Sequence, residues 1–237
     1  MQEISLAMIV KNEAAHLEGC LESAANWVDE IVIVDTGSTD GTQDIARHYT
    51  RRLFELPWPD SFSVARNYAI DQAGKQWIFW LDADDLVPEE TGARLRMLAS
   101  GASADTGFFA FNYTYPSGLV QKRAALFRNQ PDIRFTGRVH EQIYDPLTAN
   151  LGLREISLPI LHTGGAGGPE KEAFYLSLLE KDAVDRPNDY GVHFHLGMAY
   201  AASQPKKAIT ALNNVISLGA PSDAIEKAQA VLASLVA

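Results

Sequence analysis

The first 85 residues alternate between two hydrophobic periodicities, and this alternation limits the choice of fold more than any other feature of the chain. Short apolar runs rich in β-branched residues have the length of buried strands. Between them, apolar residues recur at helical spacing at Leu17, Cys20, Leu21 and Ala24. We expect strands at residues 4–10, 30–34, 51–56 and 76–81, and a helix over residues 61–73. This order predicts βαβ units and an α/β fold with a mainly parallel sheet.

The pattern changes after Pro88. A helix is expected to about residue 100, then strands at residues 106–115 and 119–128 joined by a turn, with another strand near residues 154–160. This part is predicted to be antiparallel or mixed. A glycine-rich break at residues 162–169 ends it. We therefore expect an α/β domain over residues 1–168 and an all-α tail over residues 169–237.

The tail shows the pattern of one degenerate tetratricopeptide repeat at most. Leu196, Gly197 and Tyr200 fit the first helix of such a repeat. Ala208 and Leu212 fit the second helix if one residue is missing from the turn between the two. Because a lone repeat cannot bury its own apolar face, we expect it to pack on the α/β domain or on flanking helices. A generic helical cap explains the tail equally well.

Charge and composition exclude several classes of protein. A net charge of −10, from 20 basic and 30 acidic residues, argues against nucleic acid as the main partner. Cys20 is the single cysteine, and no Cys/His cluster has zinc-site spacing, which favours a reducing compartment. No signal peptide and no 18-residue apolar stretch is found in the sequence. We expect a cytoplasmic protein without a transmembrane segment, and peripheral association with the cytoplasmic face of the inner membrane stays open.

Three carboxylates follow the last of the four N-terminal strands, at Asp82, Asp84 and Asp85. In an extended segment, Asp82 and Asp84 would face the same side and repel each other, so a cation would relieve the repulsion. Carboxylate oxygens suit Mg²⁺ or Mn²⁺, and substrate phosphates can complete the octahedron. The alternative is a solvated acidic turn that caps the helix after Pro88, with Asp85 near its N-terminus.

Another carboxylate, Asp35, ends the second strand. At that edge of an α/β sheet it could accept a hydrogen bond from a base imide or a ribose hydroxyl. A purely structural turn is the alternative, and the Ser38–Asp40 segment is best explained by turn and N-cap residues. The chain has neither a G-x-G-x-x-G motif nor a Walker lysine here. Dinucleotide binding of the Rossmann type and P-loop chemistry are both disfavoured.

Four segments in order, AMIVKNE, VDEIVIVDTGSTDGT, FSVARN and WLDADD, resemble the nucleotide-sugar-binding half of a family-2 glycosyltransferase with the GT-A fold. The later segments FTGRVHE and LHTG are similar to a bacterial branch that glycosylates lipopolysaccharide core sugars or, in some members, peptides. Several of those proteins carry tetratricopeptide-like helices after the catalytic domain. The resemblance implies a metal-dependent, inverting enzyme that moves a hexose from a UDP-sugar to a hydroxyl of a cell-envelope glycan or another acceptor.

The resemblance also implies which residues bind the nucleotide. Ile9 and Glu13 would border the base, and Asp35 would hydrogen-bond the uracil. Arg66 would approach the diphosphate or the ribose, with a helix-surface arginine as the alternative.

Four further residues are implied in the metal site and the sugar site. Asp82 would contact the ribose or the donor sugar, and Asp85 would line the donor pocket. Asp84 would bind the Mn²⁺ or Mg²⁺ ion that bridges both phosphates. His162 would complete the metal site, and a packed or surface histidine is the equal alternative.

The catalytic base is implied at Glu141. Enzymes of this kind usually carry an acidic pair, and this chain has His140–Glu141 in its place. Glu141 would take the proton of the acceptor as the acceptor oxygen attacks the anomeric carbon. His140 would orient Glu141 or help position the acceptor. A surface carboxylate paired with Arg138 is the alternative for Glu141.

Residues 120–154 hold six basic and three acidic residues. Their arginines could neutralise a diphosphate or contact a phosphorylated acceptor, and a solvated strand face explains them equally well.

Other functions fit the sequence less well. A haloacid dehalogenase-type phosphatase needs Thr or Val at the position of Leu86, and a sugar-1-phosphate nucleotidyltransferase needs a basic glycine-rich loop where the chain has Lys11 to Glu13. The remaining alternatives are a non-catalytic nucleotide-sugar-binding or helical-repeat interaction protein, and a peptide glycosyltransferase.

Overall fold

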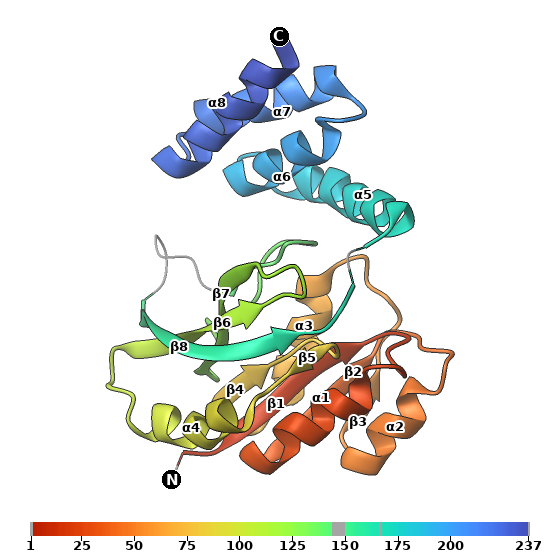
Figure 1. Ribbon diagram of the computed structural model, residues 1–237, viewed down its shortest axis with the longest axis vertical. Coiled ribbons are helices and arrows are strands. Elements are labelled where there is room, and N and C mark those ends of the chain that lie inside the picture. Colours follow the sequence, from red (N-terminus) through yellow and green to blue (C-terminus); the bar gives the residue numbers. More distant parts are fainter. Residues whose placement is uncertain (1, 144–149, 166, 237) are drawn as a thin grey trace. The chain divides into compact units, whose positions relative to one another are not determined.

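The computed structural model describes residues 2–143, 150–165 and 167–236. The chain divides into two compact units, Met1–Thr136 with Glu141–Gly165, and Gly137–His140 with Ala166–Ala237. Over the described residues, the first unit is built on an eight-stranded sheet, and the second contains helices α5 to α8 (Figure 1). Residues 137–140 belong with the helices, which a single boundary after residue 168 does not describe.

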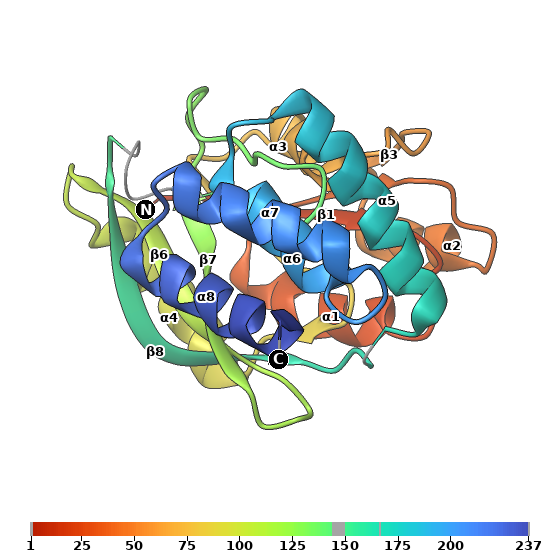
Figure 2. The same cartoon turned by 90° about the horizontal axis from the view of Figure 1, so that it is seen from above.

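The N-terminal half of the sheet is parallel, in the order β3-β2-β1-β4. Its strands are β1 (Ile4–Val10), β2 (Glu30–Asp35), β3 (Leu53–Glu55) and β4 (Trp77–Trp80). The connecting helices are α1 (Leu17–Ala24), the 3₁₀ helix η1 (Ala25–Trp27), α2 (Thr42–Tyr49) and α3 (Phe62–Gln72). Helices α1 and α2 lie on one face of the sheet and α3 on the other (Figures 1 and 2), as expected for a parallel sheet whose faces are both apolar. The predicted βαβ units are confirmed.

Local sequence explains how α1 and α3 form. The four apolar residues predicted at helical spacing, Leu17, Cys20, Leu21 and Ala24, are the buried face of α1. Helix α3 begins after Ser61, whose side chain accepts a hydrogen bond from Val64 N, the usual way in which serine satisfies an exposed N–H at a helix start.

The C-terminal half of the sheet is mixed and continues in the order β7-β6-β8-β5. Strands β6 and β7 form the predicted antiparallel hairpin, whereas β8 runs parallel to β6. Strand β5 has two residues, was not predicted, and pairs antiparallel with β8 so that Asp85 stands opposite His162. The bounds of these elements are β5 (Asp85–Leu86), α4 (Glu89–Ser100), β6 (Thr106–Thr114), β7 (Val120–Arg128) and β8 (Gly152–His162).

Aromatic side chains fill the centre of the α/β unit. Trp77, Phe79, Phe111, Tyr113 and Phe127 are all fully buried. Phe111 and Tyr113, which alternate along β6, are part of this core. Rings of this size account for much of the buried apolar area that stabilises the unit.

The second unit contains four helices over the described residues, α5 (Pro169–Asp185), α6 (Tyr190–Tyr200), α7 (Pro205–Ser217) and α8 (Ser222–Val236). Helices α6 and α7 pack closely at Gly197, where an added Cβ would lie 2.5 Å from the Leu212 side chain. Ala208, Leu212 and Val215 of α7 are buried. None of the helices in the described part of the chain is both long enough and apolar enough to span a bilayer.

Candidate active site

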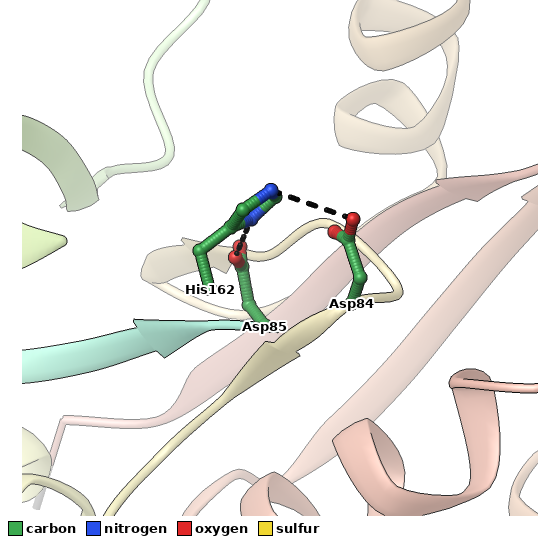
Figure 3. A group of neighbouring side chains, drawn as sticks. All are labelled: Asp84, Asp85 and His162. Carbon is green, nitrogen blue, oxygen red and sulfur yellow. Dashed lines mark hydrogen bonds and ion pairs between the residues drawn. The ribbon is translucent and has the colours of Figure 1, made fainter. Parts of the chain in front are cut away.

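Asp84, Asp85 and His162 come together at the edge where β5 pairs with β8 (Figure 3). The nearest ligand atoms of these three side chains lie within 4.8 Å of one another. His162 Nδ1 is 2.9 Å from Asp85 Oδ1, and His162 Nε2 is 3.5 Å from Asp84 Oδ2. The backbone N–H and the hydroxyl of Thr163 both donate to the carbonyl oxygen of Asp84 at 2.8 Å, which fixes the two segments side by side.

Gly164 keeps open the space beside this cluster. A Cβ at position 164 would lie 2.0 Å from Asp84 Oδ2 and 2.9 Å from His162 Nε2. A carboxylate oxygen and an imidazole nitrogen that face a small cradle are suitable ligands for a divalent cation such as Mn²⁺. The residues therefore fit the metal that the DADD segment predicts, with Asp84 and His162 as the side chains that can reach it.

Asp85 lies beneath the histidine rather than in a solvated turn. Its side chain is 0% exposed, and Oδ2 accepts a hydrogen bond from the backbone N–H of Asp82 at 2.9 Å. Burial raises the pKa of Asp85 to about 6, although the bond to His162 opposes the shift. The bond to Asp85, against the effect of burial, raises the pKa of His162. Since a carboxylate behind an imidazole fixes the ring of a metal-binding histidine, Asp85 is suited to orient His162. The alternative of a capping turn is wrong.

Asp82 is held by two arginines, and this corrects the expectation that it converges with Asp84. A turn at residues 83–84, closed by the bond from Asp85 N–H to the Asp82 carbonyl oxygen, replaces the expected extended segment. Asp82 Oδ1 accepts from Arg66 Nη2 at 2.7 Å and Oδ2 from Arg123 Nη2 at 3.1 Å. Burial would raise the pKa of Asp82, but these two guanidinium groups outweigh burial and hold the pKa well below its usual range. The arginines, rather than a cation, relieve the charge of this carboxylate.

Arg66 also contacts Glu141, which brings three predicted residues into one network. Arg66 Nε donates to Glu141 Oε1 at 2.6 Å, and the two side chains are 8% and 12% exposed. The alternative of a helix-surface arginine is therefore wrong. Arg138 pairs instead with Asp185 at 2.6 Å, so the proposed Arg138–Glu141 pair is wrong too.

The ends of β1 and β2 bring together Ile9, Glu13 and Asp35. Val10 pairs with Asp35 in register, and Ile9 with Val34. Asp35 Oδ1 accepts from the N–H groups of Gly37 and Ser38, both at 2.9 Å, and from the Gln43 side chain. Burial would raise the pKa of Asp35, but the hydrogen bonds outweigh it and lower the pKa.

The second oxygen of Asp35, Oδ2, is buried and has no hydrogen-bond partner among the described residues. A buried carboxylate oxygen without a donor is costly and suggests a missing partner. Glu13 lies within electrostatic reach of the acidic cluster, because burial and the charges of Asp84 and Asp82 raise its pKa. The structure thus brings a base-binding candidate and the metal candidate to the same edge of the sheet.

His140 has different surroundings from its neighbour Glu141. Its backbone has a φ of 52°, and its ring stacks on His195 with centroids 4.1 Å apart. Both residues belong to the helical unit, whereas Glu141 belongs to the α/β unit. The role of His140 beside the base stays a prediction.

Sequence reasoning did not single out Arg123, which it treated as one member of the basic stretch 120–154. Four of the six basic residues there pair with carboxylates of the protein, in the pairs Lys122–Glu155, Arg123–Asp82, Arg134–Asp71 and Arg138–Asp185. One acidic member of the stretch, Asp145, lies outside the described residues. Arg123 is distinguished by its position on a strand that faces the DADD segment. This position can be recognised only when the pairing of β4 with β7 is known.

Two known proteins are similar to this chain in sequence. A TPR repeat-containing protein of Synechococcus elongatus is 40% identical over 63% of this chain and 37% of its own length. The lipopolysaccharide core biosynthesis glycosyltransferase LpsC of Rhizobium meliloti is 30% identical over 59% of this chain and 56% of its own length. The chain therefore spans well under two thirds of these relatives.

The structure of Staphylococcus aureus TarS residues 1–349 in complex with UDP-GlcNAc has the same fold, with a TM-score of 0.62. The match covers 98% of this chain and 89% of that one at 15% identity. The predicted GT-A fold is confirmed. Residues 5–147 match the family model described as "Glycosyl transferase family 2". With more than half of its sequence covered by that model, the chain belongs to glycosyl transferase family 2.

Proposed function

We propose that this chain is a metal-dependent, inverting glycosyltransferase that moves a hexose from a UDP-sugar to a hydroxyl of a cell-envelope glycan. One observation carries the proposal more than any other: Asp84 and His162 face a cradle that only glycine at position 164 leaves open. A purely structural ion pair would not need that space. The family membership supports transfer of a sugar as the reaction.

The donor nucleotide fits the carboxyl ends of β1, β2 and β4. We assign Asp35 Oδ2, buried without a partner among the described residues, to accept the imide N–H of uracil. Ile9 and Glu13 border the same edge. TarS, which has the same fold, was crystallised with UDP-GlcNAc, and this supports a UDP-sugar donor for the present chain.

The catalytic step needs a base and a means of stabilising the leaving group. Glu141 takes the proton of the acceptor hydroxyl, the acceptor oxygen bonds to the anomeric carbon, and the bond to the diphosphate breaks with its electron pair on the departing oxygen. Asp84 and His162 hold a divalent cation, which supplies charge neutralisation on the leaving UDP. Asp85 keeps the His162 ring in place from behind.

The acceptor is assigned by similarity. LpsC is named for lipopolysaccharide core biosynthesis, which favours a lipopolysaccharide core-like glycan over a peptide. The helices after residue 168 are proposed as one degenerate tetratricopeptide repeat with its flanking helices, and the reaction is proposed for the cytoplasm.

Two substitutions separate donor binding from catalysis. Asp84→Ala should abolish Mn²⁺-dependent binding of UDP, because it removes a ligand of the metal. Glu141→Gln should leave UDP binding unchanged and lower turnover of the UDP-sugar by about 10²- to 10⁴-fold, the usual contribution of a general base. Turnover is measured as release of UDP from UDP-glucose, UDP-galactose and UDP-GlcNAc, with core oligosaccharide as acceptor.

Asp44→Ala and Glu90→Gln are the matched controls, since both carboxylates are well exposed and, among the described residues, each pairs with a neighbouring arginine on its own helix. A Glu141→Gln variant with full activity would place the base elsewhere. Metal-dependent UDP binding without turnover of any donor would favour the non-catalytic binding protein.

A further inference from the structure

Arg66 is enclosed by groups of the α/β unit. Its Nη2 and Nε atoms donate to Asp82 and Glu141 at 2.7 and 2.6 Å. The guanidinium carbon lies 4.3 Å from the centroid of the Trp80 ring. An arginine with two of its nitrogens on carboxylates and one face on an indole is held in one orientation.

Arg123 is a second arginine that contacts both Asp82 and Trp80. Its Nη2 donates to the second oxygen of Asp82, and its guanidinium carbon lies 4.5 Å from the Trp80 ring and 4.2 Å from the Tyr113 ring. Two arginines and two carboxylates, Asp82 and Glu141, therefore form a chain of balanced charge. Burying such charges is costly unless each one is paired, so removal of one member leaves its partner uncompensated.

Glu141 depends on this chain for its position. It lies in the loop between Thr136 and Gln142, whose backbones pair with N–O distances of 2.9 and 3.0 Å. Neither helix nor strand holds the residue itself, and a free glutamate side chain samples many rotamers. The short bond from Arg66 Nε to Oε1 fixes one carboxylate oxygen.

We propose that Arg66 is a positioning residue for Glu141, rather than a ligand of the donor diphosphate. The inference rests on the proposed function of Glu141 as the base. Arg66 holds Oε1, so the proton of the acceptor hydroxyl passes to Oε2 as the acceptor oxygen bonds to the anomeric carbon. The same fork holds Asp82, so the side chain assigned to the donor and the base are kept at a fixed spacing. Arg123, by contrast, positions only Asp82.

The test replaces the fork and keeps the charge. Lysine at position 66 has a single ammonium group and cannot reproduce two fixed bonds at once. Arg66→Lys should lower kcat about 100-fold, the size of effect expected when a reacting group is misplaced by about 1 Å. KM for the UDP-sugar and Kd for UDP with Mn²⁺ should stay within threefold, because Arg123 still bonds Asp82. Arg123→Lys leaves the bond between Arg66 and Glu141 in place and should change kcat little.

Arg128→Lys is the matched control. Arg128 is also stacked on a tryptophan, with its guanidinium carbon 4.9 Å from the Trp77 ring, but it bonds to backbone carbonyls of Ser103 and Thr106. Its kcat and KM should stay within twofold of the wild type. If Arg66→Lys instead raises Kd for UDP and leaves kcat unchanged, Arg66 is a donor ligand and the inference is wrong.

Glu141→Asp covers the case in which Arg66→Lys is poorly folded, because it shortens the other partner by one methylene and breaks the same contact. The double variant of Arg66→Lys with Glu141→Asp tests the coupling between the two side chains. If Arg66 acts through Glu141, the double variant should lose little more kcat than either single variant. Losses that multiply would refute the inference. A fully active Glu141→Gln refutes the proposed base itself, whereas an inactive Glu141→Gln with a fully active Arg66→Lys refutes only the positioning role.

Discussion

Gly164→Ala should destroy the metal site without unfolding the protein. The new Cβ would lie 2.0 Å from Asp84 Oδ2. Ordinary van der Waals contact begins at 3.4 Å, so the carboxylate oxygen would have to move by the difference, about 1.4 Å. Metal-ligand distances are held within about 0.2 Å. Asp84 therefore cannot remain a ligand.

The size of the loss follows from this displacement. Disturbing the support of a metal ligand costs about 10- to 100-fold in metal affinity, and displacing the ligand itself should reach at least the upper value. A 100-fold loss corresponds to about 2.8 kcal/mol, at about 1.4 kcal/mol for each factor of ten.

The assay is calorimetric titration of Mn²⁺ into the protein with saturating UDP. Gly165→Ala is the control in the same loop, because an added Cβ at position 165 meets nothing within 4 Å. It should bind Mn²⁺ with wild-type affinity. Wild-type Mn²⁺ affinity in Gly164→Ala would refute the metal assignment, and equal losses in both variants would point to loop flexibility instead.

Three further changes probe the base site and the helical unit. Asp35→Asn should weaken UDP binding about tenfold or more, since the amide offers the uracil imide a weaker acceptor; unchanged affinity in calorimetry would remove Asp35 from the base site. Gly197→Ala should destabilise the helical unit by about 1–3 kcal/mol, because the added methyl group overpacks against Leu212. Urea denaturation should show a lower midpoint, and an unaltered midpoint would show that this packing is wrong. The pKa of His195 is lowered to about 4 by burial and by His140, so the unfolded chain binds a proton that the folded chain does not between pH 6.5 and 4. The free energy of unfolding should fall by up to about 3 kcal/mol over that range, and His195→Asn should remove this pH dependence if the assignment is correct.

Periodicity and strand-end positions made the parallel half of the fold predictable. The spacing of residues such as Leu17 and Leu21 predicts their burial directly, and Asp35 is the last residue of its strand. Because these signals depend on residues that are close in sequence, they can be recognised without knowing which strands pair. The acidic segment after β4 was placed at the correct edge of the sheet for the same reason.

The details of the site depend on pairings between distant segments. Strand β5 has two residues, too short for a periodic signal, yet its pairing with β8 sets Asp85 opposite His162, 77 residues later. The sequence predicts that the carboxylates of Asp82 and Asp84 share one cation, but a turn between the two residues gives them different partners. Local spacing could not reveal this, because the arginine that bonds the second oxygen of Asp82 comes from β7, 41 residues away.

Glu141 illustrates the same limit. Its neighbours in sequence, Arg138 and His140, suggested local partners, but the carboxylate bonds Arg66, 75 residues earlier. Loop residues take their contacts from tertiary structure rather than from periodicity. The identity of the ion-pair partner therefore had to come from the structure.

The central claim is that a divalent cation held by Asp84 and His162 binds the donor diphosphate. Calorimetric titration of UDP, with Mn²⁺ and then with EDTA in its place, tests this claim most directly. We expect measurable UDP binding with Mn²⁺, its loss in EDTA, and the same loss in Asp84→Ala with Mn²⁺ present. UDP binding of equal strength in EDTA and in Mn²⁺, or no UDP binding under either condition, would contradict it.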